Sequence, residues 1–212
     1  AMSREEAVKA IEVGIGMVAD LKEKGYNVLA TGEMGIGNTT TSSAVCSVLL
    51  DQSVEKVTGK GAGLTNKDLE HKIEVIRQSI ALNKVNADDP LDVLAKVGGL
   101  DIAGMAGCYI GGAALNIPVF IDGFISSVAA LIAIRLVPEC APYLFPSHCS
   151  NEPAGRMILD AIGKQPYIFA NMCLGEGTGA VMGFTIADYA FKAYWELPSF
   201  EQTNFGTYEE LN

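Results

Sequence analysis

The alternation of hydrophobic and polar positions along the chain predicts helices and short strands that follow one another. Ser3 begins a capping-box pattern, and the positions after it predict a helix from Arg4 to Lys24 that ends at Gly25. The short apolar run 27–31 predicts a buried strand, and helical spacing returns over 39–50. A glycine-rich loop lies between that strand and that helix, which is the context that a phosphate-binding loop requires.

The same patterns predict the rest of the chain. They indicate helices over 65–83, 90–98, 124–136, 153–162 and 178–195, a helix rich in small residues over 102–115, strands over 118–122 and 143–145, and an apolar segment 167–169 before the last glycine cluster. Strands alternating with helices are typical of an α/β fold with a mostly parallel sheet flanked by helices, a Rossmann-like three-layer arrangement. Ligands in such folds collect outside the carboxyl ends of the strands. We therefore expect the first glycine loop, Asp122-Gly123 and the loop Ser147 to Glu152 to meet at that edge.

Composition narrows the class of protein. A chain of 212 residues that is 49% hydrophobic can bury a full core, so we predict a single α/β domain over 1–212. The formal net charge of −10 argues against a nucleic-acid partner, because counterion release needs clustered Lys and Arg. The most apolar run, Phe124 to Val137, is too short to span a bilayer, and no signal peptide opens the chain. These features predict a cytoplasmic protein.

The five cysteines are odd in number and form no C-x-x-C pair, which favours reduced thiols over a disulfide framework or a zinc site. No metal site is therefore expected. His148 beside Cys149 is a candidate nucleophile–base pair. Adjacent side chains seldom point at each other, so the pair stays the weaker interpretation.

The first glycine loop, "GEMGIGNTT", matches a phosphate-binding loop except that Asn38 stands where lysine is usual. Gly35 and Gly37 allow close backbone approach at the start of a helix, and Thr39 adds a hydroxyl donor. Because Asn38 carries no charge, a sugar monophosphate suits the loop better than a triphosphate. The alternative is a strand–helix turn that binds nothing.

Two charged residues are candidates for chemistry. Glu176 lies between Gly175 and Gly177 ahead of a helix, where a rigid turn would hold a general base and desolvation would raise its pKa. The alternative is a carboxylate that only complements the helix dipole. Lys72 lies on the helix after the second glycine cluster and is either a solvated side chain or the cation that Asn38 does not provide.

Three motifs in this order, "GEMGIGNTT", "GKGAGL" and "LGEGTGA", resemble those of the nicotinate-nucleotide:dimethylbenzimidazole phosphoribosyltransferases, which make the lower-ligand nucleotide of cobalamin. The segments "DPLDVLAKVGGLDIAGMAG", "PVFIDGF" and "SHCSNEP" support this resemblance, which extends from about Ala7 to Leu197. Members of that family usually carry an N-terminal helical part that supplies part of the benzimidazole pocket. We expect that part to be missing from this chain, which places the activity of the shortened polypeptide in question.

The resemblance implies a reaction and a set of site residues. Phosphoribose passes from nicotinate mononucleotide to 5,6-dimethylbenzimidazole or a related base, nicotinate leaves, and an α-linked nucleotide forms. Glu176 matches the catalytic base that removes the azole proton, and Glu33 matches an acid at the ribose and base end of the site. The positions that match substrate contacts are Gly35, Gly37, Asn38 and Thr39 in the first loop, Gly61 and Lys72 at the phosphate, Ser150 in the H-x-S-x-E-P loop, and Leu174, Gly175 and Gly177 around the catalytic glutamate. The resemblance further implies small-molecule substrates, no cofactor, no membrane and a homodimer.

Two other functions stay open at this point. A non-catalytic module that binds a nucleoside monophosphate would use the same glycine loops without needing the glutamates. An atypical P-loop-like NTPase is disfavoured by Asn38 and by the lack of an obvious Walker B carboxylate.

Overall fold

The computed structural model describes residues 1–203. Three short strands, β1 (Leu29–Ala30), β2 (Val119–Ile121) and β3 (Leu144–Pro146), form a parallel sheet in the order β1-β2-β3. The α-helices of the described residues are α1 (Arg4–Glu23), α2 (Asn38–Leu49), α3 (Val54–Val57), α4 (Asn66–Asn83), α5 (Pro90–Val97), α6 (Leu100–Ala114), α7 (Phe124–Leu136), α8 (Gly155–Ala161) and α9 (Thr178–Glu196). Helices α6, α7 and α9 contact the central strand β2. The predicted α/β class, with a parallel sheet flanked by helices, is confirmed.

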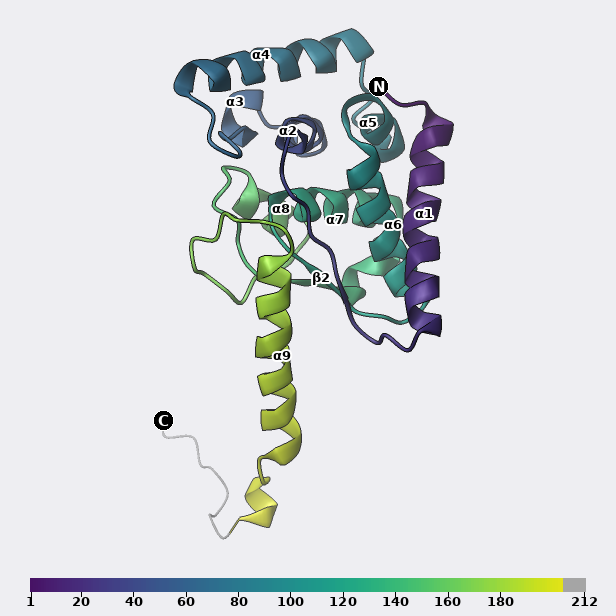
Figure 1. Ribbon diagram of the computed structural model, residues 1–212, viewed down its shortest axis with the longest axis vertical. Helices are drawn as coiled ribbons and strands as arrows, with labels where there is room; N and C mark the ends of the chain where they lie inside the picture. Colours follow the sequence, from purple (N-terminus) through teal and green to yellow (C-terminus); the bar gives the residue numbers. More distant parts are fainter. Residues whose placement is uncertain (204–212) are drawn as a thin grey trace, which may run out of the picture.

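Helix α1 begins and ends as its sequence predicts, and it packs against α6 (Figure 1). The Ser3 hydroxyl accepts the backbone N–H of Glu6, while the Glu6 carboxylate accepts that of Ser3, which completes the capping box. A Cβ on Gly14 would overlap the backbone of α6, and a Cβ on Gly107 would overlap that of α1. The predicted close packing of the small-residue helix is therefore confirmed, with α1 as its partner.

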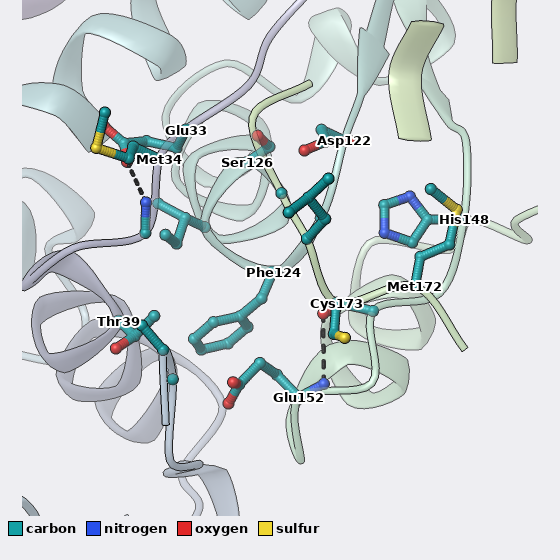
Figure 2. Close-up of a pocket in the computed structure, with 18 residues that line it drawn as sticks. Glu33, Met34, Thr39, Asp122, Phe124, Ser126, His148, Glu152, Met172 and Cys173 are labelled. Carbon is teal, nitrogen blue, oxygen red and sulfur yellow. Dashed lines mark hydrogen bonds between the residues drawn. The ribbon is translucent and has the colours of Figure 1, made fainter. Parts of the chain in front are cut away.

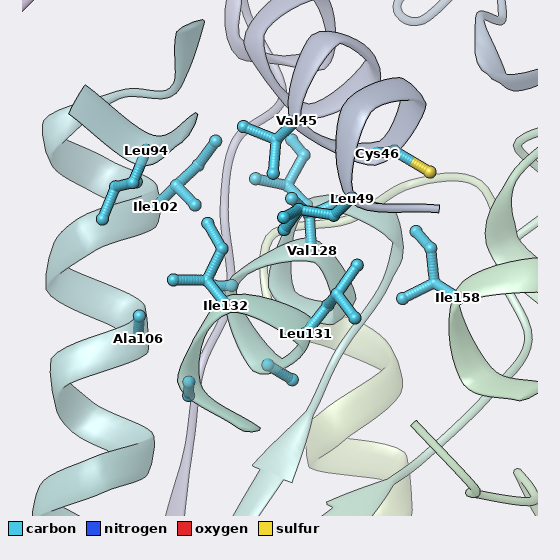
Figure 3. Close-up of a cluster of buried hydrophobic side chains, with 14 of the residues drawn as sticks. Val45, Cys46, Leu49, Leu94, Ile102, Ala106, Val128, Leu131, Ile132 and Ile158 are labelled. Atoms are coloured by element: carbon cyan, nitrogen blue, oxygen red, sulfur yellow. The ribbon is translucent and has the colours of Figure 1, made fainter. Parts of the chain in front are cut away.

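The hydrophobic core lies between the sheet and helices α2, α5, α6, α7 and α8. Figure 3 shows side chains of α2, including Val45, against side chains of α6 and α7, including Ile102 and Leu131. Every residue of α7 from Phe124 to Ala133 is buried, so this helix has no solvent-exposed face in its first ten positions. Burial of each large aliphatic side chain contributes roughly 1.5–3 kcal/mol. The predicted buried helix 124–136 is confirmed at both ends.

Several predicted elements differ from the structure. The strand expected over 27–31 pairs only at Leu29–Ala30, and the segment 167–169 contributes a single bridge between Ile168 and His148. The helix expected from residue 153 begins at Gly155, after a turn. Helix α3 and the 3₁₀ helix η1 (Pro138–Tyr143) were not predicted. Each is a single short segment that lacks the repeated apolar spacing by which longer helices are recognised.

Helix α9 starts at the sheet and extends away from the rest of the molecule (Figure 1). Its far half exposes several aromatic side chains, which are Tyr189, Phe191, Tyr194 and Trp195. The single domain predicted over 1–212 includes residues 204–212, which lie outside the described residues, and it stays a prediction. Within residues 1–203, we find no helix with both the length and the apolar character needed to cross a membrane.

Candidate active site

A cavity of about 300 Å³ opens at the carboxyl ends of the three strands. Its walls come from the glycine loop after β1, from the segment that follows β2, and from the loop that follows β3. Figure 2 shows Glu33 and Thr39 from the first of these segments, Phe124 from the second and His148 from the third, arranged around the cavity. The expectation that these three segments meet at one edge of the sheet is confirmed.

The first and third glycine motifs are joined through their backbones. The N–H of Glu176 donates to the carbonyl oxygen of Glu33 at 2.8 Å. A Cβ on Gly32 would overlap the backbone nitrogen of Gly177, so only glycine permits this approach. Gly175, Glu176 and Gly177 all have left-handed φ angles, of 81°, 58° and 80°. A non-glycine residue in that conformation is uncommon, and the two glycines beside Glu176 reduce the strain of the turn.

The carboxylate of Glu33 lines the cavity and accepts the backbone N–H of Gly35 at 2.8 Å. That amide is one that the loop was expected to offer to a ligand. In this structure it is held by the loop's own acid, so an anion that binds Gly35 must displace the Glu33 carboxylate.

Asp122, at the end of β2, is the acid that caps helix α9. Its side chain is 2% exposed. Its two carboxylate oxygens accept the backbone N–H groups of Gly177, Gly179 and Ala180 at 3.0, 2.8 and 3.1 Å. A carboxylate at a helix N-terminus is stabilised by the helix dipole as well as by these hydrogen bonds. The dipole interaction considered for Glu176 is therefore supplied by Asp122, while Glu176 itself is exposed.

The burial predicted for Glu176 is not present in this structure. Its neighbour Gly175 lines the cavity, so Glu176 lies at the cavity rim, and its carboxylate accepts no hydrogen bond within residues 1–203. Left-handed backbone on both sides turns this residue out of the helix that follows. The carboxylate is consequently available to a ligand that covers the rim.

Lys72 is buried behind Thr39 and does not line the cavity. Its side chain is 7% exposed, and its ammonium donates to the Thr39 hydroxyl at 2.8 Å and to the Gly59 carbonyl at 3.0 Å. Burial lowers the pKa of Lys72, and the negative charge of Glu152 partly opposes that effect. Because the Thr39 oxygen accepts from Lys72, its own proton is free to be donated into the cavity.

The cavity is acidic. Glu33, Asp122 and Glu152 line it, and no lysine or arginine does so in the part of the chain that the structure describes. One carboxylate oxygen of Glu152 is buried without a hydrogen-bond partner within residues 1–203. A Cβ on Gly59 would overlap that oxygen, so glycine at this position makes room for the acid. Such a cavity favours positive charge on a ligand.

His148 and Cys149 do not form the nucleophile–base pair considered from the sequence. The Cys149 thiol donates to the Ser150 carbonyl oxygen at 3.7 Å, and burial raises the pKa of that thiol. The His148 ring interacts with Ser147 instead, at 3.1 Å. Each of the five cysteines is a free thiol in the structure. Within residues 1–203, no cluster of three or more His, Cys, Asp and Glu side chains is placed to hold a metal ion.

A family model described as Phosphoribosyltransferase (DBI_PRT) matches residues 1–205. The chain belongs to this phosphoribosyltransferase family.

Relatives with known names agree with that family. The chain is 54% identical over 211 residues to the nicotinate-nucleotide--dimethylbenzimidazole phosphoribosyltransferase of Ruminiclostridium cellulolyticum, and 51% identical over 209 residues to that of Acetivibrio thermocellus. The two alignments cover 100% and 99% of this chain, and 60% of each relative. The chain therefore spans about 60% of the length of the curated relatives that it matches.

A solved structure of CobT from Thermus thermophilus has the same fold. It superposes with a TM-score of 0.89 at 34% sequence identity, over 95% of this chain and 60% of that protein. The fold and the family are thus established for the region that the chain covers.

The predicted site residues of this phosphoribosyltransferase family member fall into two groups. The first group lines the cavity and consists of Glu33, Gly35, Thr39, Gly61, Ser150, Leu174 and Gly175. The second group does not line the cavity and consists of Gly37, Asn38, Lys72, Glu176 and Gly177. Gly37 is the residue before α2, and the Asn38 amide donates to Asp101 at 2.7 Å. The roles of all these residues in binding and catalysis stay predictions.

Other cavity residues were not singled out from the sequence as substrate contacts. They are Met34, Ala62, Asp122, Gly123, Phe124, Ile125, Ser126, His148, Glu152, Met172 and Cys173. Asp122 and the loop 147–152 carried a signal, because they follow predicted strands at the edge where ligands bind. Phe124 and Ser126 carried none, since they lie within an apolar helix whose side chains are otherwise core.

Proposed function

We propose that this chain transfers phosphoribose from nicotinate mononucleotide to 5,6-dimethylbenzimidazole or a related base, and the name nicotinate-nucleotide--dimethylbenzimidazole phosphoribosyltransferase, which its relatives carry, supports this proposal. The observation that carries this proposal is the backbone link between Glu33 and Glu176 at the mouth of one acidic cavity. It joins the backbones of the two acids, which supports the proposal that both carboxylates act on the same ligand.

The charge of the cavity supports nicotinate mononucleotide as the donor substrate. Its pyridinium ring is cationic, and positive charge develops at C1′ as the bond to nicotinate breaks. Carboxylates such as Glu33 stabilise charge at both places. The electron pair of the broken bond returns to the pyridine nitrogen, which leaves neutral in its ring and needs no metal.

The other substrate groups have partners of suitable chemistry. The Thr39 hydroxyl, supported by Lys72, lies at the cavity wall and suits a phosphate oxygen. Leu174 and Met34 offer exposed apolar side chains for an aromatic base. A ring nitrogen of that base attacks C1′ while Glu176 takes the proton from its other nitrogen. Attack from the face opposite nicotinate converts a β-linked ribose into an α-linked one.

The test is direct assay of the two products. The chain is incubated with nicotinate mononucleotide and dimethylbenzimidazole, and released nicotinate and α-ribazole phosphate are quantified together by mass spectrometry. Equal amounts of both products are expected. Binding of the nucleotide without either product would favour the non-catalytic module, and Mg²⁺-dependent phosphate release from ATP would favour an NTPase.

We also propose a cytoplasmic homodimer. The free thiols are compatible with a reducing compartment, and the exposed aromatic side chains of α9 offer an apolar surface for a second copy. Light scattering on the purified chain would give its mass in solution. A monomeric mass at micromolar concentration would contradict the dimer.

A further inference from the structure

His148 is a buried ring in the cavity wall to which the proposed reaction assigns no role. It is 4% exposed and lines the cavity, where Figure 2 shows its ring across from Glu33 and Thr39. It lies two residues after β3 and forms a bridge with Ile168, so backbone pairing fixes its place at the edge of the sheet. The chain has only two histidines, and the other, His71, is exposed on α4.

Hydrogen bonding determines which ring nitrogen of His148 carries the proton. The Ser147 hydroxyl donates its single proton to the Ile121 carbonyl at 2.7 Å. Its oxygen therefore accepts the proton of His148 Nδ1, at 3.1 Å. Burial lowers the pKa of His148, and the nearby charge of Asp122 partly opposes that effect, which favours the neutral ring. The neutral ring leaves a lone pair on Nε2.

Packing directs that lone pair into the cavity. A Cβ on Gly179 would overlap the Nδ1 side of the ring, so α9 holds the ring tightly from one side. A Cβ on Gly123, which lines the cavity, would lie 3.7 Å from both Cε1 and Nε2, so the Nε2 edge of the ring lies beside the cavity. Nε2 has no hydrogen-bond partner within residues 1–203. The buried side-chain atoms without a partner within residues 1–203 do not include Nε2, so its lone pair is open to the cavity, where a ligand that donates to it gains a hydrogen bond.

The chemistry of the acceptor selects the part of the ligand that meets it. A neutral imidazole nitrogen accepts from O–H or N–H and offers nothing to a phosphate or a carboxylate. The proposed phosphate partner Thr39 lies across the cavity, and nicotinate has no donor besides its ring hydrogens. The azole proton of the base is assigned to Glu176 at the rim. The sugar hydroxyls are the donors that remain.

We propose that His148 Nε2 accepts a hydrogen bond from a ribose hydroxyl of the nucleotide, which makes His148 a residue that selects ribose over deoxyribose. This assignment rests on the proposed function. It adds a contact to the sugar, from the segment after β3, to the contacts expected from the glycine loops.

The test compares the affinities of several ligands for wild type and for variants of His148. Nicotinate mononucleotide and its 2′-deoxy and 3′-deoxy analogues are titrated by calorimetry into wild type, His148→Asn and His148→Gln. Asparagine keeps the donor to Ser147 but lacks an acceptor at the Nε2 position, whereas the glutamine carbonyl can replace that acceptor. His71→Gln is the matched control on the exposed histidine.

In wild type, removal of the hydroxyl that meets His148 is expected to weaken binding about 10-fold, since a hydrogen bond of about 1.4 kcal/mol is a factor of ten. In His148→Asn the same removal should change affinity little, and His148→Gln should recover part of the difference. If each deoxy analogue loses as much affinity for His148→Asn as it does for wild type, the assignment is overturned.

A second measurement needs no variant at the site. In the wild-type chain labelled with ¹⁵N-histidine, the Nε2 signal of His148 should shift when nicotinate mononucleotide binds, and His71→Gln identifies that signal. A shift on addition of dimethylbenzimidazole alone would assign the acceptor to the base and overturn the ribose contact. An unchanged signal in the saturated complex would overturn it as well. Failure of wild type to bind the nucleotide at all would overturn the proposed function and this assignment together, whereas binding without a shift overturns only the latter.

Discussion

The backbone N–H of Glu176 donates to the carbonyl oxygen of Glu33 at 2.8 Å, and this bond fixes the distance between the two glycine motifs. Because it joins main chains, both carboxylates stay free for other interactions. Glu33 uses one oxygen on Gly35 inside the cavity, and Glu176 lies exposed at the rim. The pair therefore places one acid in the cavity wall and one at its rim.

Glu176→Gln should abolish transfer and preserve nucleotide binding. The amide keeps the shape of the side chain but cannot accept the azole proton, and general bases contribute roughly 10²–10⁴-fold to a rate. The measurement is kcat for nicotinate release together with the calorimetric Kd for nicotinate mononucleotide. A variant that keeps more than about a tenth of the wild-type kcat would show that Glu176 is not the base.

Gly32→Ala should separate the two motifs. The new Cβ would overlap the nitrogen of Gly177, and overpacking of this kind costs about 1–3 kcal/mol of stability. We expect kcat to fall more steeply than the thermal transition does, since the main effect is on the spacing of Glu33 and Glu176. Gly16→Ala is the control, because Gly16 is exposed in α1 with open space around it, and alanine there should stabilise the helix by about 0.5–1 kcal/mol. Normal kcat in Gly32→Ala would show that this spacing is not needed.

Local signals were sufficient for most of the fold. The capping residue Ser3 and the helix-initiating Pro90 mark helix starts that the structure reproduces, because caps and helix-start prolines act over one turn of chain. The strand–loop–helix context of the first motif could also be predicted from adjacent residues. The common edge of the site follows from a general property of parallel sheets rather than from any single residue.

The contacts that position the site could not be predicted from the sequence, since they join residues far apart in the chain. Asp122 was placed at the correct edge, but its three hydrogen bonds to the start of α9 depend on how β2 and α9 pack. Lys72 was expected to face a phosphate directly. The structure places Thr39 between Lys72 and the cavity, which depends on the packing of α2 against α4.

Asp122→Asn should lower both stability and turnover. The amide retains one acceptor for three backbone N–H groups and places an amide donor toward the helix N-terminus. Loss of charge-assisted bonds and of the dipole interaction should lower the free energy of unfolding by about 3 kcal/mol. The exposed Asp88→Asn is the control for charge alone. Because Asp122 holds the turn that contains Glu176, we expect kcat to fall while the Kd for the nucleotide changes little. Equal loss of binding and turnover in the folded variant would show a purely structural role.

Lys72→Met should weaken nicotinate mononucleotide and spare the phosphate-free riboside. Methionine fills similar volume but removes the charge behind Thr39. Because Lys72 acts through the Thr39 hydroxyl and not by a direct bond to the phosphate, we expect a loss of about 10-fold, near the lower end of the roughly 1.5–3 kcal/mol of a charge-assisted hydrogen bond. Lys67→Met, on an exposed position of the same helix α4, is the matched control. Comparable losses for the nucleotide and the riboside would show that Lys72 does not act through the phosphate.

The lowered pKa of Lys72 adds a pH dependence whose sign differs between binding and stability. Burial brings the pKa below the usual 10.5, so the folded chain loses this proton at a lower pH than the unfolded chain does. Affinity for the nucleotide should therefore fall as pH rises through the lowered pKa, before 10.5 is reached. In that same window the unfolded state holds more protons, so this group makes the free energy of unfolding rise with pH. Calorimetric titrations of nucleotide and riboside across the alkaline range, in wild type and Lys72→Met, separate the two effects. A nucleotide affinity with the same alkaline profile in both proteins would exclude Lys72 as the source.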